Sequence, residues 1–188
     1  MEPRENIFKQ KQAKTHNCFT WECLGDIRKG RANLGEEMPV LIYRLLEFTM
    51  LDVLVKELGE EKAHDMFRKA GFLAGKELAK NELDLEQEFD GFAAQLQEVL
   101  RNLKIGILRI EACDGDGQTL TLTVGEDLDC SGLPSTNEVV CHYDEGFIAG
   151  LLYAYTGKKY EVKEIDCWAK GDRVCRFRGT VTDSDENA

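Results

Sequence analysis

The sequence predicts an α+β fold in which N-terminal helices pack on an antiparallel sheet. Helical periodicity runs from about residue 39 to residue 106, and the period then changes to the alternation of strands. One more helix and one more pair of strands follow before residue 180. Because helices and strands are segregated along the chain, the pattern argues against a doubly wound parallel sheet.

Residues 39–59, 60–81 and 86–106 are expected to form three amphipathic helices, because apolar side chains recur in each at helical spacing. Pro39 suits the first turn of the first helix, and Gly59 suits its end. In the second helix, glycines would let another helix approach closely. The buried face predicted there holds Phe67, Ala70, Ala74 and Leu78, beside Gly71 and Gly75. The stripe predicted for the third helix holds Phe89, Phe92, Ala93, Leu96, Val99, Leu100 and Leu103.

Two hairpins and a helix are expected after residue 106. Apolar and polar residues alternate on both sides of the run DGDG at residues 114–117, whose residue types tolerate the positive φ of a tight turn. Residues 144–157 form a helix that Gly157 can cap. The run KEIDCWAKGDRVCRF, residues 163–177, makes the last hairpin.

Composition limits the class of protein. The 188 residues include 43% hydrophobic residues, enough for a core, and carry a formal net charge of -11. We expect no nucleic-acid partner and no membrane partner, because such an acidic surface repels phosphate backbones and anionic lipids. There is no run of eighteen apolar residues and no apolar signal core, which predicts a cytoplasmic protein. We divide the chain into an N-terminal extension (1–34), one domain (35–180) and an acidic tail (181–188).

The cysteines predict a metal site. Seven cysteines in a reducing compartment are more often metal ligands or free thiols than disulfides. Cys130, Cys141, Cys167 and Cys175 lie in the last third of the chain, and Glu164 stands three residues before Cys167. Zinc takes four ligands, which three thiolates and one more group supply. The residues alone leave that fourth ligand open between Glu164 and Cys130. On a regular strand Glu164 and Cys167 would point to opposite faces, so Glu164 could join only if a bulge lay between them.

A pocket for a small hydrophobic ligand is a second hypothesis. Aromatic and aliphatic residues of the third helix would face apolar residues of the first hairpin. The predicted lining is Phe89, Phe92, Leu96, Ile110 and Leu122. The same residues could simply fill the core. We expect no catalytic residues and no enzymatic activity, since the sequence holds no nucleophile elbow, phosphate loop or dinucleotide fingerprint.

The run from Asp129 to Phe177 closely resembles the 4-vinyl-reductase (hydrocarbon-binding) domain family. It carries Cys-Ser-Gly-Leu-Pro, the helix Gly-Phe-Ile-Ala-Gly, and the ending Glu-x-x-Cys-Trp-Ala-x-Gly-Asp-x-x-Cys-x-Phe. The match is looser over residues 34–128, where it rests on LGEEMPVLIYRLLEF and the helical layout.

The resemblance implies an α+β domain related to haem–nitric-oxide sensor domains and Golgi tethering subunits, and it implies a homodimer. In aromatic-sensing members, three cysteines and a glutamate hold structural zinc, at a spacing that matches Cys141, Glu164, Cys167 and Cys175. It therefore favours Glu164 over Cys130 and implies a zinc-tied C-terminal hairpin. Phenol-sensing members also use a mid-domain histidine and tryptophan, which this chain lacks between His64 and His142 and between Trp21 and Trp168.

Together these features predict a zinc-stabilised homodimer that binds or senses a small hydrophobic or aromatic molecule. Two alternatives remain open: a protein-interaction or tethering module without a ligand, and an accessory protein of tetrapyrrole biosynthesis.

Overall fold

A computed structural model of the chain describes residues 19–182. The chain divides into two units, Met1–Gly35 and Glu36–Ala188. The described part of the first unit holds a 3-10 turn, Trp21–Leu24, and the short helix α1, Ile27–Gly30. The predicted extension and acidic tail fall largely on residues outside the described range.

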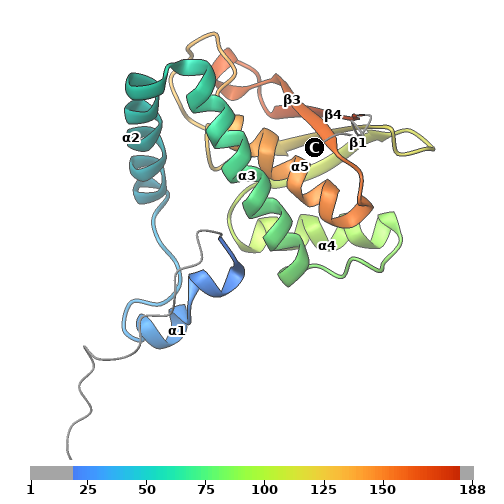
Figure 1. The fold of residues 1–188 in the computed structure, drawn as a ribbon, viewed down its shortest axis with the longest axis horizontal. Coiled ribbons are helices and arrows are strands. Elements are labelled where there is room, and N and C mark those ends of the chain that lie inside the picture. Colours follow the sequence, from blue (N-terminus) through green and yellow to red (C-terminus); the bar gives the residue numbers. More distant parts are fainter. Residues whose placement is uncertain (1–18, 183–188) are drawn as a thin grey trace, which may run out of the picture. The chain divides into compact units, whose positions relative to one another are not determined.

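The second unit combines four helices with a four-stranded sheet, which confirms the α+β prediction (Figure 1). Its helices are α2 (Val40–Leu58), α3 (Glu60–Glu82), α4 (Phe89–Asn102) and α5 (His142–Thr156). Its strands are β1 (Ile107–Cys113), β2 (Thr119–Gly125), β3 (Tyr160–Asp166) and β4 (Cys175–Val181). A 3-10 turn, Trp168–Lys170, lies between the last two strands.

The sheet is antiparallel throughout, with the strand order β1-β2-β4-β3. One row of paired residues crosses all four strands: Ile110 pairs with Leu122, Leu122 with Phe177, and Phe177 with Glu164. Two residues further along β2, on the same face of the sheet, Val124 lies opposite Cys175. The register therefore carries an apolar row directly to the region of the predicted metal ligands.

Helices α3 and α5 cross at glycines on both helices. A Cβ at Gly75 would lie 2.0 Å from the carbonyl oxygen of Phe147, and one at Gly146 would lie 1.9 Å from that of Arg68. Only glycine permits so close an approach of two backbones. The close approach predicted for the second helix thus occurs inside the fold. The buried face of α3 is accordingly shifted from the predicted one, with Gly71 and Gly75 buried and Ala70 exposed.

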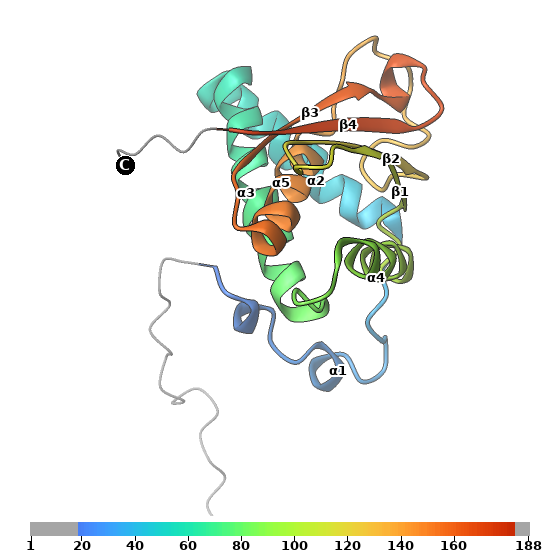
Figure 2. The ribbon, with the colours of Figure 1, turned by 90° about the vertical axis from the view of Figure 1, so that its right-hand side faces the viewer.

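Helices α4 and α5 lie on the same side of the sheet (Figure 2). Four of the predicted apolar positions of α4 are buried: Phe92, Ala93, Leu96 and Leu100. Leu103 is exposed instead, because the helix ends at Asn102. Helix α5 ends as predicted at Gly157, which adopts the left-handed conformation with φ of 72°. The space between these two helices and the sheet is the core of the unit.

Helix α2 differs from the expected amphipathic helix, since none of its residues is buried. Leu41 is 66% exposed and Leu46 is 63% exposed. Its polar residues hold it to the loop after β2: Tyr43 Oη donates to Asp129 Oδ1 at 2.8 Å, and Arg44 donates to the carbonyl oxygens of Leu128 and Ser131. Although α2 is apolar, no helix within residues 19–182 has the length and the uncharged apolar run needed to cross a bilayer.

Candidate functional site

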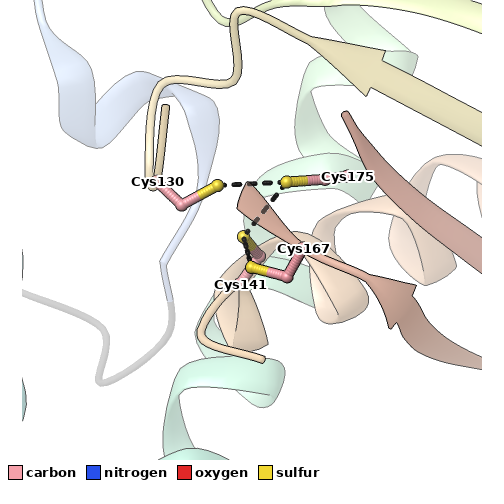
Figure 3. A group of neighbouring side chains, drawn as sticks. All are labelled: Cys130, Cys141, Cys167 and Cys175. Carbon is pink, nitrogen blue, oxygen red and sulfur yellow. Dashed lines mark hydrogen bonds between the residues drawn. The ribbon is translucent and has the colours of Figure 1, made fainter. Parts of the chain in front are cut away.

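The four cysteines of the last third of the chain come together at one end of the sheet (Figure 3). Cys130 lies in the loop after β2, Cys141 caps the N-terminus of α5, Cys167 follows β3, and Cys175 opens β4. All four are free thiols, and none is more than 1% exposed. The glycine turn predicted between the last two strands is present, with Gly171 at φ of 100°. We call these four side chains the cysteine cluster.

The spacing of the sulfur atoms suits a tetrahedral thiophilic ion. All four Sγ atoms lie within 4.8 Å of one another. Cys141 Sγ lies 3.9 Å from Cys167 Sγ and 3.8 Å from Cys175 Sγ. Two thiolates bound tetrahedrally to zinc at about 2.3 Å stand about 3.8 Å apart. Cys130 Sγ lies only 3.0 Å from Cys175 Sγ, which is shorter than that spacing. Among the described residues, the thiols close enough together to hold one ion are therefore all four, Cys130, Cys141, Cys167 and Cys175, and Glu164 is not part of that group.

Glu164 reaches the edge of the cysteine cluster. The register of β3 against β4 shifts between Glu164 and Asp166, which is the bulge that this residue needed in order to face the cysteines. Its Oε2 accepts a hydrogen bond of 3.1 Å from the backbone N–H of Cys141. Its Oε1 is buried and lacks a hydrogen-bond partner. A buried carboxyl oxygen without a partner is costly unless something else, such as a cation, satisfies it.

The cluster concentrates its negative charge on one thiolate, Cys167. Hydrogen bonds from Cys130, Cys141 and Cys175 hold the pKa of the Cys167 thiol below its usual range. Burial, followed by the interaction with Cys167, raises the pKa of Glu164 to about 8. The thiols around this thiolate still carry protons. A divalent cation that binds here would displace those protons.

Glu145 on α5 supports this end of the sheet. Its Oε2 accepts from Arg68 Nε of α3 at 2.6 Å, and its Oε1 accepts from the backbone N–H of Glu164 at 3.0 Å. Burial alone would raise its pKa, but hydrogen bonds from His142 and Arg68 lower the pKa of Glu145 to about 2. This carboxylate therefore joins α3, α5 and the β3 bulge in one network.

Four further carboxyl groups lie beside the cysteine cluster, and sequence reasoning did not identify them. We call Glu47, Asp127, Asp129 and Asp144 the acid cluster. Burial raises the pKa of Asp129 to about 7 and that of Glu47 to about 8, and it also raises the pKa values of Asp127 and Asp144. Oxygen atoms of Glu47, Asp129 and Asp144 are buried without a hydrogen-bond partner. Two acids just before Cys130, and one within the apolar sequence of α5, were the available signals.

An apolar cavity lies between α4, α5 and the first two strands. All five residues of the predicted pocket line it: Phe89, Phe92, Leu96, Ile110 and Leu122. Its volume is about 30 Å³. Every lining residue is apolar except Asp127 and Asp144, which lie where the cavity meets the cysteine cluster. We call this space the core cavity.

Comparison with known proteins places the chain among relatives of the same architecture. The profile of the V4R domain matches residues 120–181. The Methanocaldococcus jannaschii protein MJ1642 is 30% identical over 151 residues, which are 80% of this chain and 83% of that protein.

Three solved structures share the fold. The phenol-responsive sensory domain of the transcription activator PoxR, solved with phenol, has a TM-score of 0.59 at 19% identity, over 87% of this chain and 94% of that one. A vinyl-4-reductase family protein from M. jannaschii has a TM-score of 0.59 at 16% identity, over 88% and 98%. Subunit 3 of a trafficking protein particle complex from Naegleria fowleri, covalently bound to palmitic acid, has a TM-score of 0.56 at 15% identity, over 77% and 98%.

The sequence identity to a relative of nearly the same length, the profile match and the shared fold all agree with the motifs of the C-terminal hairpin. The chain belongs to the V4R (4-vinyl-reductase) domain family.

Proposed function

We propose that this chain is a zinc-stabilised, homodimeric module that binds or senses a small hydrophobic or aromatic molecule. The core cavity carries the proposal, because fifteen of its seventeen lining residues are apolar and it is built from both layers of the fold. Apolar cavities with few polar groups are the usual sites of small-molecule binding. The fold shared with the phenol-responsive PoxR domain supports binding or sensing over catalysis.

The size of the core cavity sets a condition on binding. A cavity that holds benzene in an engineered protein measures about 150 Å³. The core cavity, at about 30 Å³, must therefore widen before it accepts an aromatic ring. A tetrapyrrole is larger still, and the cavity volume gives that alternative no support.

A pair of substitutions on α4 tests the proposal. Ala93 lines the core cavity, whereas its neighbour Ala94 is exposed. In Ala93→Leu the added side chain fills the space, so toluene should no longer raise the melting temperature. Toluene should still raise it in the wild type and in Ala94→Leu. A rise of equal size in Ala93→Leu, or no rise in any of the three proteins, would contradict the proposal.

Zinc is the second part of the proposal. We propose Cys141, Cys167 and Cys175 as three of its ligands and Glu164 as the fourth. The Cys141 sulfur spacings and the unpartnered Glu164 Oε1 support this set, whereas the position of Cys130 Sγ within 4.8 Å of the other three sulfur atoms supports Cys130 as the alternative fourth ligand. Four protein ligands leave no open position, so such a zinc is structural. It would tie the N-terminus of α5 to the last hairpin.

The homodimer is the third part, and α2 is the surface that supports it. Exposed apolar residues cover this helix, including Leu45, Leu46, Met50 and Val53. A patch of this kind is typical of an interface. The same observation favours a second candidate, a protein-interaction module whose main partner is another chain. The toluene experiment separates the two, because a pure interaction module needs no ligand.

A further inference from the structure

Two carboxyl groups, Asp127 and Asp144, line the otherwise apolar core cavity, and Asp144 has an oxygen without a hydrogen-bond partner. Asp144 projects from the first turn of α5, is only 8% exposed, and lines a cavity whose other walls are almost entirely apolar. Its Oδ2 is fully buried and has no hydrogen-bond partner. An unpaired buried carboxyl oxygen costs free energy that a bound donor would recover.

Asp127 faces this group and forms a side-chain hydrogen bond with it. Asp127 Oδ1 accepts hydrogen bonds from the backbone N–H groups of Asp129 at 2.9 Å and Cys130 at 3.1 Å, which anchors it in the loop after β2. An oxygen of Asp127 and one of Asp144 lie within 4.8 Å of each other. A proton shared between two facing carboxyl groups joins one oxygen of each, so it leaves Asp144 a second oxygen that can accept a hydrogen bond from another donor.

From these contacts we infer that Asp144 is the specificity-determining residue of the core cavity, selecting small apolar molecules that carry a hydroxyl or amine hydrogen-bond donor at one end. The inference rests on the proposed ligand-binding function. The apolar walls take the body of the ligand, and the donor meets Asp144 Oδ2 at the polar end. A carboxyl group offers an acceptor oxygen whether it is ionised or protonated, so a hydroxyl donor fits both forms, whereas an ammonium donor fits only the ionised form.

Three ligands of one shape test the inference. Ethylbenzene, benzyl alcohol and benzylamine have the same number of heavy atoms and differ only in the terminal group. Ethylbenzene partitions more readily into any apolar site, so the informative quantity is the ratio of its Kd to that of a donor-bearing ligand. That ratio is compared between the wild-type chain and Asp144→Leu by ligand-observed NMR titration, as in a double-mutant cycle.

In Asp144→Leu, we expect the ratio for benzyl alcohol to fall at least about tenfold, the scale of one lost buried hydrogen bond. Ethylbenzene should bind this variant at least as tightly as the wild type. The control is Asp90→Leu, the same chemical change at an exposed position of α4, where the ratio should not move. Should Asp144→Leu fail to fold, Asp144→Ala replaces it with Asp90→Ala as its control, and the ratio for benzyl alcohol should again fall at least about tenfold.

Two results would overturn the inference, and they are distinguishable. If ethylbenzene binds all variants and the ratio is the same in Asp144→Leu as in the wild type, the cavity binds ligands but Asp144 does not select them. If none of the three compounds binds the wild-type chain, the ligand-binding function fails together with the inference.

Discussion

At the scale of single residues, the acid cluster is the part of the molecule most sensitive to pH. Glu47 lies on α2 next to Asp129, and burial and the charges of Asp129 and Asp127 raise its pKa from 4.5 to about 8. A carboxyl group whose pKa is raised by folding binds protons more tightly in the folded state. Ionisation of Glu47 therefore lowers the free energy of unfolding progressively as pH rises from about 4.5 through about 8.

Substituting Glu47 should remove part of this pH dependence. In Glu47→Gln, the melting temperature at pH 8.5 should exceed that of the wild type by several degrees, because ionising Glu47 no longer opposes folding. At pH 5 the two proteins should melt within about a degree of each other, since Glu47 is then protonated in the folded wild type. Differential scanning calorimetry measures the melting temperatures. The control is Glu57→Gln, an exposed change on the same helix. A difference that is the same at both pH values would count against this role.

The ligand set of the cysteine cluster is also a question about single residues. Cys175→Ser should lose zinc and much of its stability, because metal-binding energy is part of the folding energy. Glu164→Gln should bind zinc more weakly than the wild type, whereas Cys130→Ser should keep one zinc per chain. Competition with a chromogenic chelator measures each affinity, and Cys113→Ser, an exposed cysteine of β1, is the control. Loss of zinc in Cys130→Ser with normal binding by Glu164→Gln would show a site of four thiolates instead.

At the scale of elements, the crossing of α3 and α5 determines the arrangement of the helices. In Gly75→Ala the new methyl group would lie 2.0 Å from a backbone carbonyl oxygen of α5, and a backbone cannot move aside as a side chain can. We expect a loss of at least about 2 kcal/mol in the free energy of unfolding, measured in urea. Gly115→Ala adds a methyl group in open space and should change stability by less than about 0.5 kcal/mol. Equal effects of the two substitutions would contradict the packing.

Most of the elements could be predicted from local pattern. The alternation around DGDG gave both strands of the first hairpin, and the spacing of Phe92, Ala93, Leu96 and Leu100 gave the buried face of α4. The sequence could not say which helix meets Gly71 and Gly75, because that depends on tertiary packing with α5. Nor did periodicity reveal that the apolar residues of α2 remain exposed, since an apolar stripe looks the same whether it faces a core or a partner.

The candidate site was predictable where its residues are chemically distinctive. Four cysteines and five cavity residues were named from the sequence, and the structure brings each group together. Asp144 was not recognised, because an acid near a helix N-terminus is normally a favourable surface residue. The role proposed for Asp144 depends on its burial beside Asp127. Asp127 lies in a loop seventeen residues earlier, and only the fold brings the two residues together.

At the scale of the whole molecule, α2 should decide the oligomeric state. Leu46→Glu places a charge in the exposed apolar face and should convert the proposed dimer to a monomer of 21.3 kDa, because burying an unpaired carboxylate at an interface is costly. Size-exclusion chromatography with light scattering measures the mass, and Leu103→Glu, an exposed change at the end of α4, should remain dimeric. A wild-type chain that is monomeric at micromolar concentration would remove the homodimer from the account.

We propose that a structural zinc ties the last hairpin to α5 beneath a ligand cavity. Native mass spectrometry of the full chain, purified without chelators, tests it most directly, because one spectrum reports the metal, the oligomer and any retained small molecule. We expect a dimer with one zinc per chain, and loss of that zinc in Cys175→Ser. A wild-type protein that carries no zinc would contradict it.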